Sequence, residues 1–83
     1  QDSYTLSPNP TNQWLKFQRQ EGFSEYQQQY QIIDFLGRTV LSGTIQTSQL
    51  SIDLDLSTIS SGTYRLLIQN PDGSMEALPF IKE

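Results

Sequence analysis

The fold of this chain is decided by the stretch Tyr64-Arg65-Leu66-Leu67-Ile68-Gln69-Asn70-Pro71-Asp72-Gly73. In its first half, Tyr64, Leu66 and Ile68 occupy every second position, which is the pattern of a strand with one buried face. In its second half, proline presets φ at one corner of a turn and glycine accepts a positive φ at another. The stretch therefore predicts a β-strand that ends in a tight turn.

Six further segments alternate in the same way, and Gly, Pro, Asn, Asp and Ser separate them. They span residues 4–6, 14–18, 25–33, 38–45, 50–55 and 75–82. Because almost no segment repeats at helical spacing, the pattern predicts an all-β fold: a single antiparallel β-sandwich of about seven short strands, immunoglobulin-like in arrangement. We expect residues 1–83 to form one domain.

The apolar phase of each strand predicts the core between two sheets. Val40 and Ile45 are both expected to turn inward, with Gly43 as the candidate position of a bulge. The glutamines of residues 27–31 are expected on a solvated sheet face. The predicted core consists of Leu15, Phe17, Ile32, Val40, Ile52, Tyr64, Leu66 and Ile68.

The composition argues against several classes of function. The 83 residues include no cysteine and no histidine, so a disulfide framework, a thiolate metal site and the usual general base are missing. The net charge of −4 disfavours contact with nucleic acid phosphates and anionic membranes. No apolar run approaches the roughly 20 residues that span a bilayer. We therefore expect no enzyme activity, no metal site, no cofactor, no nucleic-acid partner and no direct membrane insertion.

Two groups of residues suggest a site and have a simpler structural explanation. Asp53 and Asp55 share one face of a strand and resemble paired carboxylates or two ligands of a hard metal, but no third ligand lies nearby, so a solvated acidic face is favoured. A set of aromatic residues resembles a sugar-stacking platform, but a core this small needs most aromatics as packing. That set is Trp14, Phe17, Tyr26, Tyr30, Phe35 and Tyr64.

The order of the turn residues carries further information. The chain contains, in sequence, Pro8-Asn9-Pro10; a Leu-x-Phe strand at residues 15–17; Ile-x-Asp-x-x-Gly-Arg-x-Val at residues 32–40; Leu-x-x-Ile-x-x-Gly-x-Tyr at residues 56–64; and Phe-Ile-Lys at residues 80–82. This arrangement resembles the C-terminal sorting domain of the type IX secretion system, also called the Por secretion system tail. The resemblance covers nearly the whole chain, although Pro79 and Glu83 depart from the usual pattern of the last strand.

The resemblance implies that the domain labels a cargo for export. Family members reach the periplasm, are taken through the outer membrane by a translocon with its shuttle proteins, and are often cut and attached at the cell surface by a sortase. The resemblance assigns structural roles to its turn and core positions. These are Pro8, Asn9, Pro10, Asp34, Gly37, Arg38, Gly62 and Tyr64. Because the chain starts without methionine, we expect it to be part of a longer precursor.

The last strand is the candidate for recognition by that machinery. Pro79 cannot donate a ladder hydrogen bond, so the strand is expected at a sheet edge with part of its backbone unpaired. A partner then binds by strand addition or by capture of the chain end. The predicted recognition residues are Phe80, Ile81, Lys82 and Glu83. The alternative is that Leu78 and Phe80 complete the core while the last three residues fray.

Two other classes of function fit the same fold. An immunoglobulin-like or fibronectin-like spacer or adhesion module is the first, and a carbohydrate-binding module is the second. The position of the domain in its precursor separates them, because a sorting domain occurs once, at the end, whereas a spacer or adhesion module occurs internally or in tandem.

Overall fold

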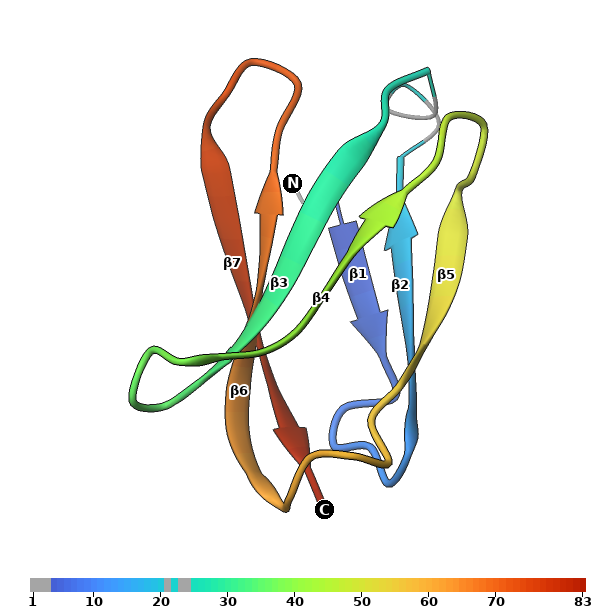
Figure 1. The fold of residues 1–83 in the computed structure, drawn as a ribbon. Coiled ribbons are helices and arrows are strands. Elements are labelled where there is room, and N and C mark those ends of the chain that lie inside the picture. Colours follow the sequence, from blue (N-terminus) through green and yellow to red (C-terminus); the bar gives the residue numbers. More distant parts are fainter. Residues whose placement is uncertain (1–3, 21, 23–24) are drawn as a thin grey trace.

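The computed structural model describes residues 4–20, 22 and 25–83, and in this part of the chain seven strands form two sheets (Figure 1). One sheet has the order β1-β2-β5 and the other the order β4-β3-β6-β7, and all pairings between these strands are antiparallel. The predicted antiparallel sandwich is confirmed. The strands are β1 (Tyr4–Ser7), β2 (Trp14–Arg19), β3 (Gln28–Asp34), β4 (Thr39–Ile45), β5 (Ser51–Asp55), β6 (Gly62–Gln69) and β7 (Met75–Lys82).

Three hairpins and three crossings between the sheets connect these strands. β1–β2, β3–β4 and β6–β7 are hairpins within a sheet, whereas the chain changes sheet between β2 and β3, between β4 and β5, and between β5 and β6. Residues 1–3, with which the predicted domain begins, lie outside the described residues. No helix in the described ranges is long and apolar enough to cross a membrane.

The core lies between the sheets, and most of the predicted core residues are in it. Val40 and Ile52 are only half-buried and pack against its margin. Aromatic rings stack in the core. The ring of Tyr4 stacks on Phe17 with centroids 5.4 Å apart, and that of Tyr64 stacks on Phe80 with centroids 5.7 Å apart. The buried apolar side chains are Tyr4, Leu15, Phe17, Ile32, Ile45, Leu54, Leu56, Tyr64, Leu66, Ile68 and Phe80.

The expected bulge exists, but it is not at Gly43. Gly43 pairs regularly with Tyr30, and the register shifts where Ile32 faces Leu41 while Ile33 faces Thr39, so that Val40 is the extra residue. Gly43 has another role, since a Cβ at this position would lie 2.7 Å from Cζ of Tyr30. The glycine therefore provides the space in which the Tyr30 ring lies.

Some predicted boundaries are also wrong. The segment expected to begin at residue 25 becomes a strand only at Gln28, and Tyr26 before it is exposed. Leu50 lies before β5 and is exposed, although its phase predicted an inward side chain. On β3, Gln29 and Gln31 are solvated as expected, whereas Gln28 is buried.

Candidate functional site

The residues that carry the family resemblance gather at one end of the sandwich. This end, called the tail end below, carries the β1–β2 loop (residues 8–13), the β3–β4 turn (35–38), the β5–β6 loop (56–61) and the end of β7 (Figure 1). The end of β2, the start of β3, the β4–β5 and β6–β7 connections and the start of β1 lie at the opposite end. Antiparallel pairing produces this division, because alternate connections in such sheets fall at alternate ends.

The β1–β2 loop is bonded to the end of β7. The Asn9 side chain accepts from the backbone N–H of Ile81 at 3.1 Å and donates to the carbonyl of Pro79 at 3.4 Å. The backbone N–H of Thr11 donates to the Ile81 carbonyl at 3.0 Å, and the N–H of Glu83 donates to the Thr11 carbonyl at 2.8 Å. These five residues are called the loop–tail junction. The Asn9 amide and the Thr11 backbone replace the missing neighbour strand of β7.

The hydrogen bonds of the junction show that the sheet edge is not free at the end of the chain, contrary to the expectation. β7 is an edge strand, as Pro79 predicted, but backbone groups at Pro79, at Ile81 and at Glu83, which follows the strand, are bonded. Lys82 forms an isolated parallel bridge with Thr11. The last residues are thus held in place, which also argues against the alternative of a frayed end.

The four predicted recognition residues differ in how accessible their side chains are. The Phe80 side chain is buried in the core, so it can act only through the fold. Ile81 is 49% exposed and Glu83 is exposed as well. Lys82 is half-buried, and its ammonium group donates to the Glu83 carbonyl at 3.0 Å. The side chains of Ile81 and Glu83 are therefore the accessible ones.

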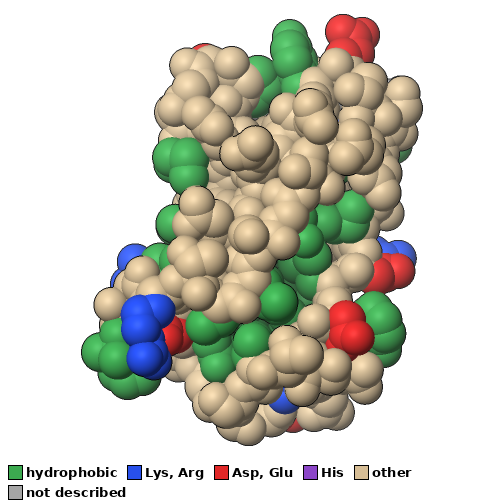
Figure 2. Space-filling view, in the orientation of Figure 1, with side chains coloured by type: hydrophobic (Ala, Val, Ile, Leu, Met, Phe, Trp, Pro, Cys, Tyr) green, Lys and Arg blue, Asp and Glu red, His purple; other side chains and the backbone are tan. Residues whose placement is uncertain are grey.

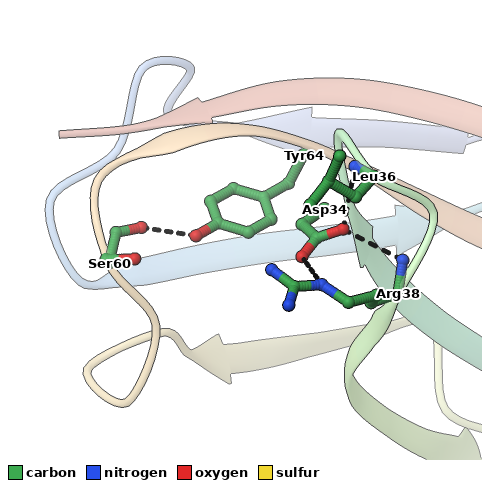
Figure 3. A network of polar contacts seen from close by, with 5 residues as sticks. All are labelled: Asp34, Leu36, Arg38, Ser60 and Tyr64. Atoms are coloured by element: carbon green, nitrogen blue, oxygen red, sulfur yellow. Dashed lines mark hydrogen bonds and ion pairs between the residues drawn. The ribbon is translucent and has the colours of Figure 1, made fainter.

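The β3–β4 turn is fixed by the carboxylate of Asp34 (Figure 3). Its Oδ1 accepts from the N–H groups of Leu36 at 3.0 Å and Arg38 at 2.9 Å, and its Oδ2 lies 2.9 Å from Nε of Arg38. The backbone hydrogen bond from Arg38, followed by the side-chain bond from the same residue, lowers the pKa of Asp34. Gly37 has φ of 86°, which favours glycine. Asp34 and Gly37 therefore build the turn.

The β5–β6 loop ends in a tyrosine corner. The Tyr64 hydroxyl donates to the Ser60 carbonyl at 2.6 Å, four residues upstream (Figure 3). Leu56 is buried and Ile59 packs against the core, so both anchor the loop. The Gly62 φ of 158° is close to extended. Because the Tyr64 ring stacks on Phe80, this corner also supports the strand that ends in the loop–tail junction.

The opposite end contains a buried polar network that the sequence analysis did not predict. Arg19 and Gln28 are both buried, and Arg19 Nη1 donates to Gln28 Oε1 at 2.8 Å. Gln28 Nε2 donates to the Tyr4 hydroxyl and to the Gln69 carbonyl, each at 2.8 Å. The position of Arg19 in the sequence is the signal that could have revealed this network, because Arg19 continues the inward phase of Leu15 and Phe17. The network ties together the connections at the end remote from the loop–tail junction.

The two alternative sites are not assembled. Asp53 and Asp55 are exposed, and Asp55 Oδ1 accepts from the N–H of Ser57 at 3.0 Å, so it stabilises a turn. In the described part of the chain, no group of three or more Asp, Glu, His or Cys side chains could hold a metal ion. Of the aromatic set, Phe17 and Tyr64 are buried, while Trp14 and Tyr26 are exposed at different ends of the sandwich.

Solved structures share this fold at low sequence identity. A DUF3244 family protein with an immunoglobulin-like β-sandwich fold from Bacteroides vulgatus matches with a TM-score of 0.78 and 18% identity over 98% of this chain and 85% of that protein. The soluble domain of PmoD from Methylocystis matches with a TM-score of 0.62 and 12% identity over 89% of this chain and 76% of that one. These matches concern the fold alone. No curated protein matches the sequence.

A family model gives the more specific comparison. The model described as the secretion system C-terminal sorting domain matches residues 5–80. The match includes the Pro8–Pro10 segment, the Asp34 turn and the tyrosine corner of Tyr64. Sorting signals are a non-catalytic kind of domain, and membership of this family implies a secreted or cell-surface protein. The chain therefore belongs to the family of type IX secretion system C-terminal sorting domains.

Proposed function

We propose that this domain directs the protein that carries it through the outer membrane, and that the export machinery reads the loop–tail junction. One observation supports this: motifs that lie between residues 8 and 82 of the sequence come together at the tail end. Their polar groups order the end of the chain, with Asn9 and Thr11 bonded to β7. The sites at which a partner reads the domain then lie on a fixed surface.

The position of β1 supports the same proposal. β1 begins at the opposite end of the sandwich from the loop–tail junction (Figure 1). In a protein with this domain at its C-terminus, the cargo joins the domain through the segment that precedes β1. The tail end is then the end that different cargoes leave uncovered, which a common label requires.

The bonded backbone of the last residues determines how a partner binds there. Strand addition next to Ile81 would have to displace Asn9 and Thr11 from its N–H and carbonyl groups. A partner instead contacts the Ile81 and Glu83 side chains and the chain end, with the junction intact. Pre-ordering of these residues lowers the entropy cost of that contact.

The partners in this proposal are the outer-membrane translocon and shuttle proteins of the type IX system, followed by the cell-surface sortase. The domain is present in the periplasm in transit and then at the cell surface or in the medium. It catalyses nothing itself. A domain of net charge −4 without histidine or cysteine suits a passive label of this kind.

The proposal is tested with a reporter fused to the domain in a bacterium that has this secretion system. Deletion of Ile81, Lys82 and Glu83, and separately Asn9→Ala, is expected to leave the reporter in the periplasm. Asn12→Ala, an exposed residue of the same loop, serves as the matched control. The melting temperature of each purified domain separates loss of recognition from loss of folding.

The outcomes are distinct. Retention in the periplasm by a variant that still melts cooperatively supports direct reading of the junction. Undiminished surface delivery of both variants contradicts it. If the wild-type domain itself fails to export the reporter, a spacer or adhesion module is the better explanation of the fold.

A further inference from the structure

The β3–β4 turn exposes two neighbouring large apolar side chains. Phe35 is 78% exposed and Leu36 is 63% exposed, and no other large hydrophobic residue of the described chain is exposed to this extent. In Figure 2, hydrophobic side chains lie beside a basic side chain at the lower left, where Figure 1 places the tip of the β3–β4 hairpin. The apolar pair therefore projects from the body of the domain.

The turn does not need these two side chains for its own stability. The Asp34 carboxylate fixes it through the N–H groups of Leu36 and Arg38, and the Asp34 carbonyl accepts from the N–H of Gly37 at 2.9 Å. All these contacts involve the backbone or Asp34, and none uses the Phe35 or Leu36 side chain. Turn positions usually carry polar residues. An apolar pair here costs solubility and contributes nothing to the core.

The same contacts make the pair a pre-organised ligand. Because the backbone from Asp34 to Arg38 is held by four hydrogen bonds at 2.9–3.0 Å, little backbone freedom is lost when the tip is bound. Rigid aromatic and aliphatic anchors that fill a pocket dominate the energy of many protein interfaces. Phe35 and Leu36 have the exposure and rigidity of such an anchor.

The charges near the tip indicate a protein as the binding partner. Arg38 is 71% exposed although its Nε is paired with Asp34 (Figure 3). One cation and two apolar side chains are too few to hold a chain of net charge −4 on an anionic membrane. An apolar pocket with an acidic rim matches both features of the tip.

We infer that the Phe35–Leu36 tip inserts into an apolar pocket with a negatively charged rim on a protein of the export machinery. This inference rests on the proposed sorting function. The tip lies at the tail end, as does the loop–tail junction, and the domain measures 23 by 21 Å in its two shorter extents. A standard interface covers roughly 800 Å² on each partner. One partner surface of ordinary size can therefore contact both features.

The test compares three variants of the domain fused to a reporter in a bacterium with this secretion system. Phe35→Ser combined with Leu36→Ser removes the apolar tip. Leu50→Ser combined with Met75→Ser is the matched control, because it removes two exposed apolar side chains from the opposite end. Arg38→Gln removes the positive charge and leaves the backbone bonds to Asp34.

The tip variant is expected to keep its melting temperature while the surface-delivered reporter falls about tenfold or more, as for loss of a buried anchor. The control is expected to export normally, and Arg38→Gln is expected to export less than wild type. Normal export by the tip variant overturns the inference. Normal export by Arg38→Gln overturns the part of it that gives the partner's pocket an acidic rim.

A second measurement separates the protein partner from a lipid surface. The purified domain is sedimented with vesicles of phosphatidylethanolamine and phosphatidylglycerol. We expect no binding, and binding that disappears in the tip variant would overturn the inference in favour of a membrane contact. Failure of the wild-type reporter to leave the periplasm would instead reject the sorting function, and with it the role of the tip.

Discussion

Arg19 donates from Nη1 to Oε1 of Gln28 at 2.8 Å, and both side chains are buried. The same guanidinium donates to the carbonyls of Gln49 at 2.6 Å, Tyr26 at 2.7 Å and Gln46 at 2.8 Å. Each of these four acceptors is uncharged. Burial accordingly lowers the pKa of Arg19, and the planar fork of the group matches four separate oxygens.

Replacement of Arg19 is expected to destabilise the domain. Arg19→Met leaves the buried Oε1 of Gln28 and three partly buried main-chain carbonyls without this donor, and we expect a loss of roughly 2–4 kcal/mol in the free energy of unfolding. Arg19→Lys is expected to recover only part of this, because an ammonium group cannot reach all four acceptors. Denaturant unfolding measures both, with Arg65→Met on the exposed face of β6 as the control. Equal stability of Arg19→Met and Arg65→Met would contradict the structural role of the network.

Removal of the Tyr64 hydroxyl is expected to cost about 1 kcal/mol, the net value of one hydrogen bond. Tyr64→Phe keeps the ring on Phe80 and loses only the bond to the Ser60 carbonyl. In a domain of this size the change corresponds to a fall of roughly 4–8 °C in the melting temperature. Tyr26→Phe, at an exposed ring, is the matched control. A melting temperature equal to that of the control would show that the corner contributes no stability.

Gly43→Val is expected to destabilise the domain even though valine favours strands. A Cβ at residue 43 would lie 2.7 Å from Cζ of Tyr30, so the ring must move, and overpacking of this kind costs about 1–3 kcal/mol. In a Tyr30→Ala background the same substitution is expected to cost nothing or to stabilise. A thermal melt of the four proteins of this double-mutant cycle measures the coupling. Additive effects would show that the ring and the glycine do not interact.

Acid is expected to weaken the turns through three aspartates. The pKa values of Asp34, Asp55 and Asp72 are all lowered from the usual 3.8, chiefly by the backbone bond from Arg38, the backbone bond from Ser57 and the side-chain bond from Ser74, respectively. Because each folded-state pKa is lowered, the stabilisation is complete above the usual value. It is lost as the pH falls below about 4 and through the folded-state pKa values.

The test is a set of thermal melts between neutral pH and about pH 2.5. The protein with Asp34→Asn, Asp55→Asn and Asp72→Asn keeps acceptor oxygens in the turns and loses their titration. Its melting temperature is expected to vary less with pH at the acid end than that of wild type. Parallel acid curves for the two proteins would assign the acid sensitivity to other groups.

Local patterns in the sequence were enough to predict the strands and two turns. The Asn70–Gly73 turn is closed by a hydrogen bond from the N–H of Gly73 to the Asn70 carbonyl at 2.9 Å, and Gly73 has the expected positive φ, 94°. Asp34 and Gly37 likewise build the turn in which they were placed. These features depend on residues within four positions of one another, so their signal is contained in the sequence.

The features that could not be predicted depend on contacts between distant residues or on a shift in the alternation of inward and outward side chains. The bulge at Val40 changes the alternation within β4, so Val40 is half-buried where full burial was expected. Pro79 predicted an edge strand with part of its backbone unpaired, but Asn9 and Ile81 show no local sign of their contact, so the bonding of the last residues was not foreseen. Arg19 was assigned no core role because its charge obscured its inward phase.

The contact between Asn9 and Ile81 also bears on the order of folding. It joins residues 72 positions apart, so it closes a loop of nearly the whole chain and carries a large loop-closure entropy. Contacts of such high sequence separation form late, after the strands between them have collapsed. The loop–tail junction is therefore expected only in a domain whose strands have already assembled. A receptor that requires it would act as a checkpoint and would ignore nascent or misfolded chains with the same linear sequence.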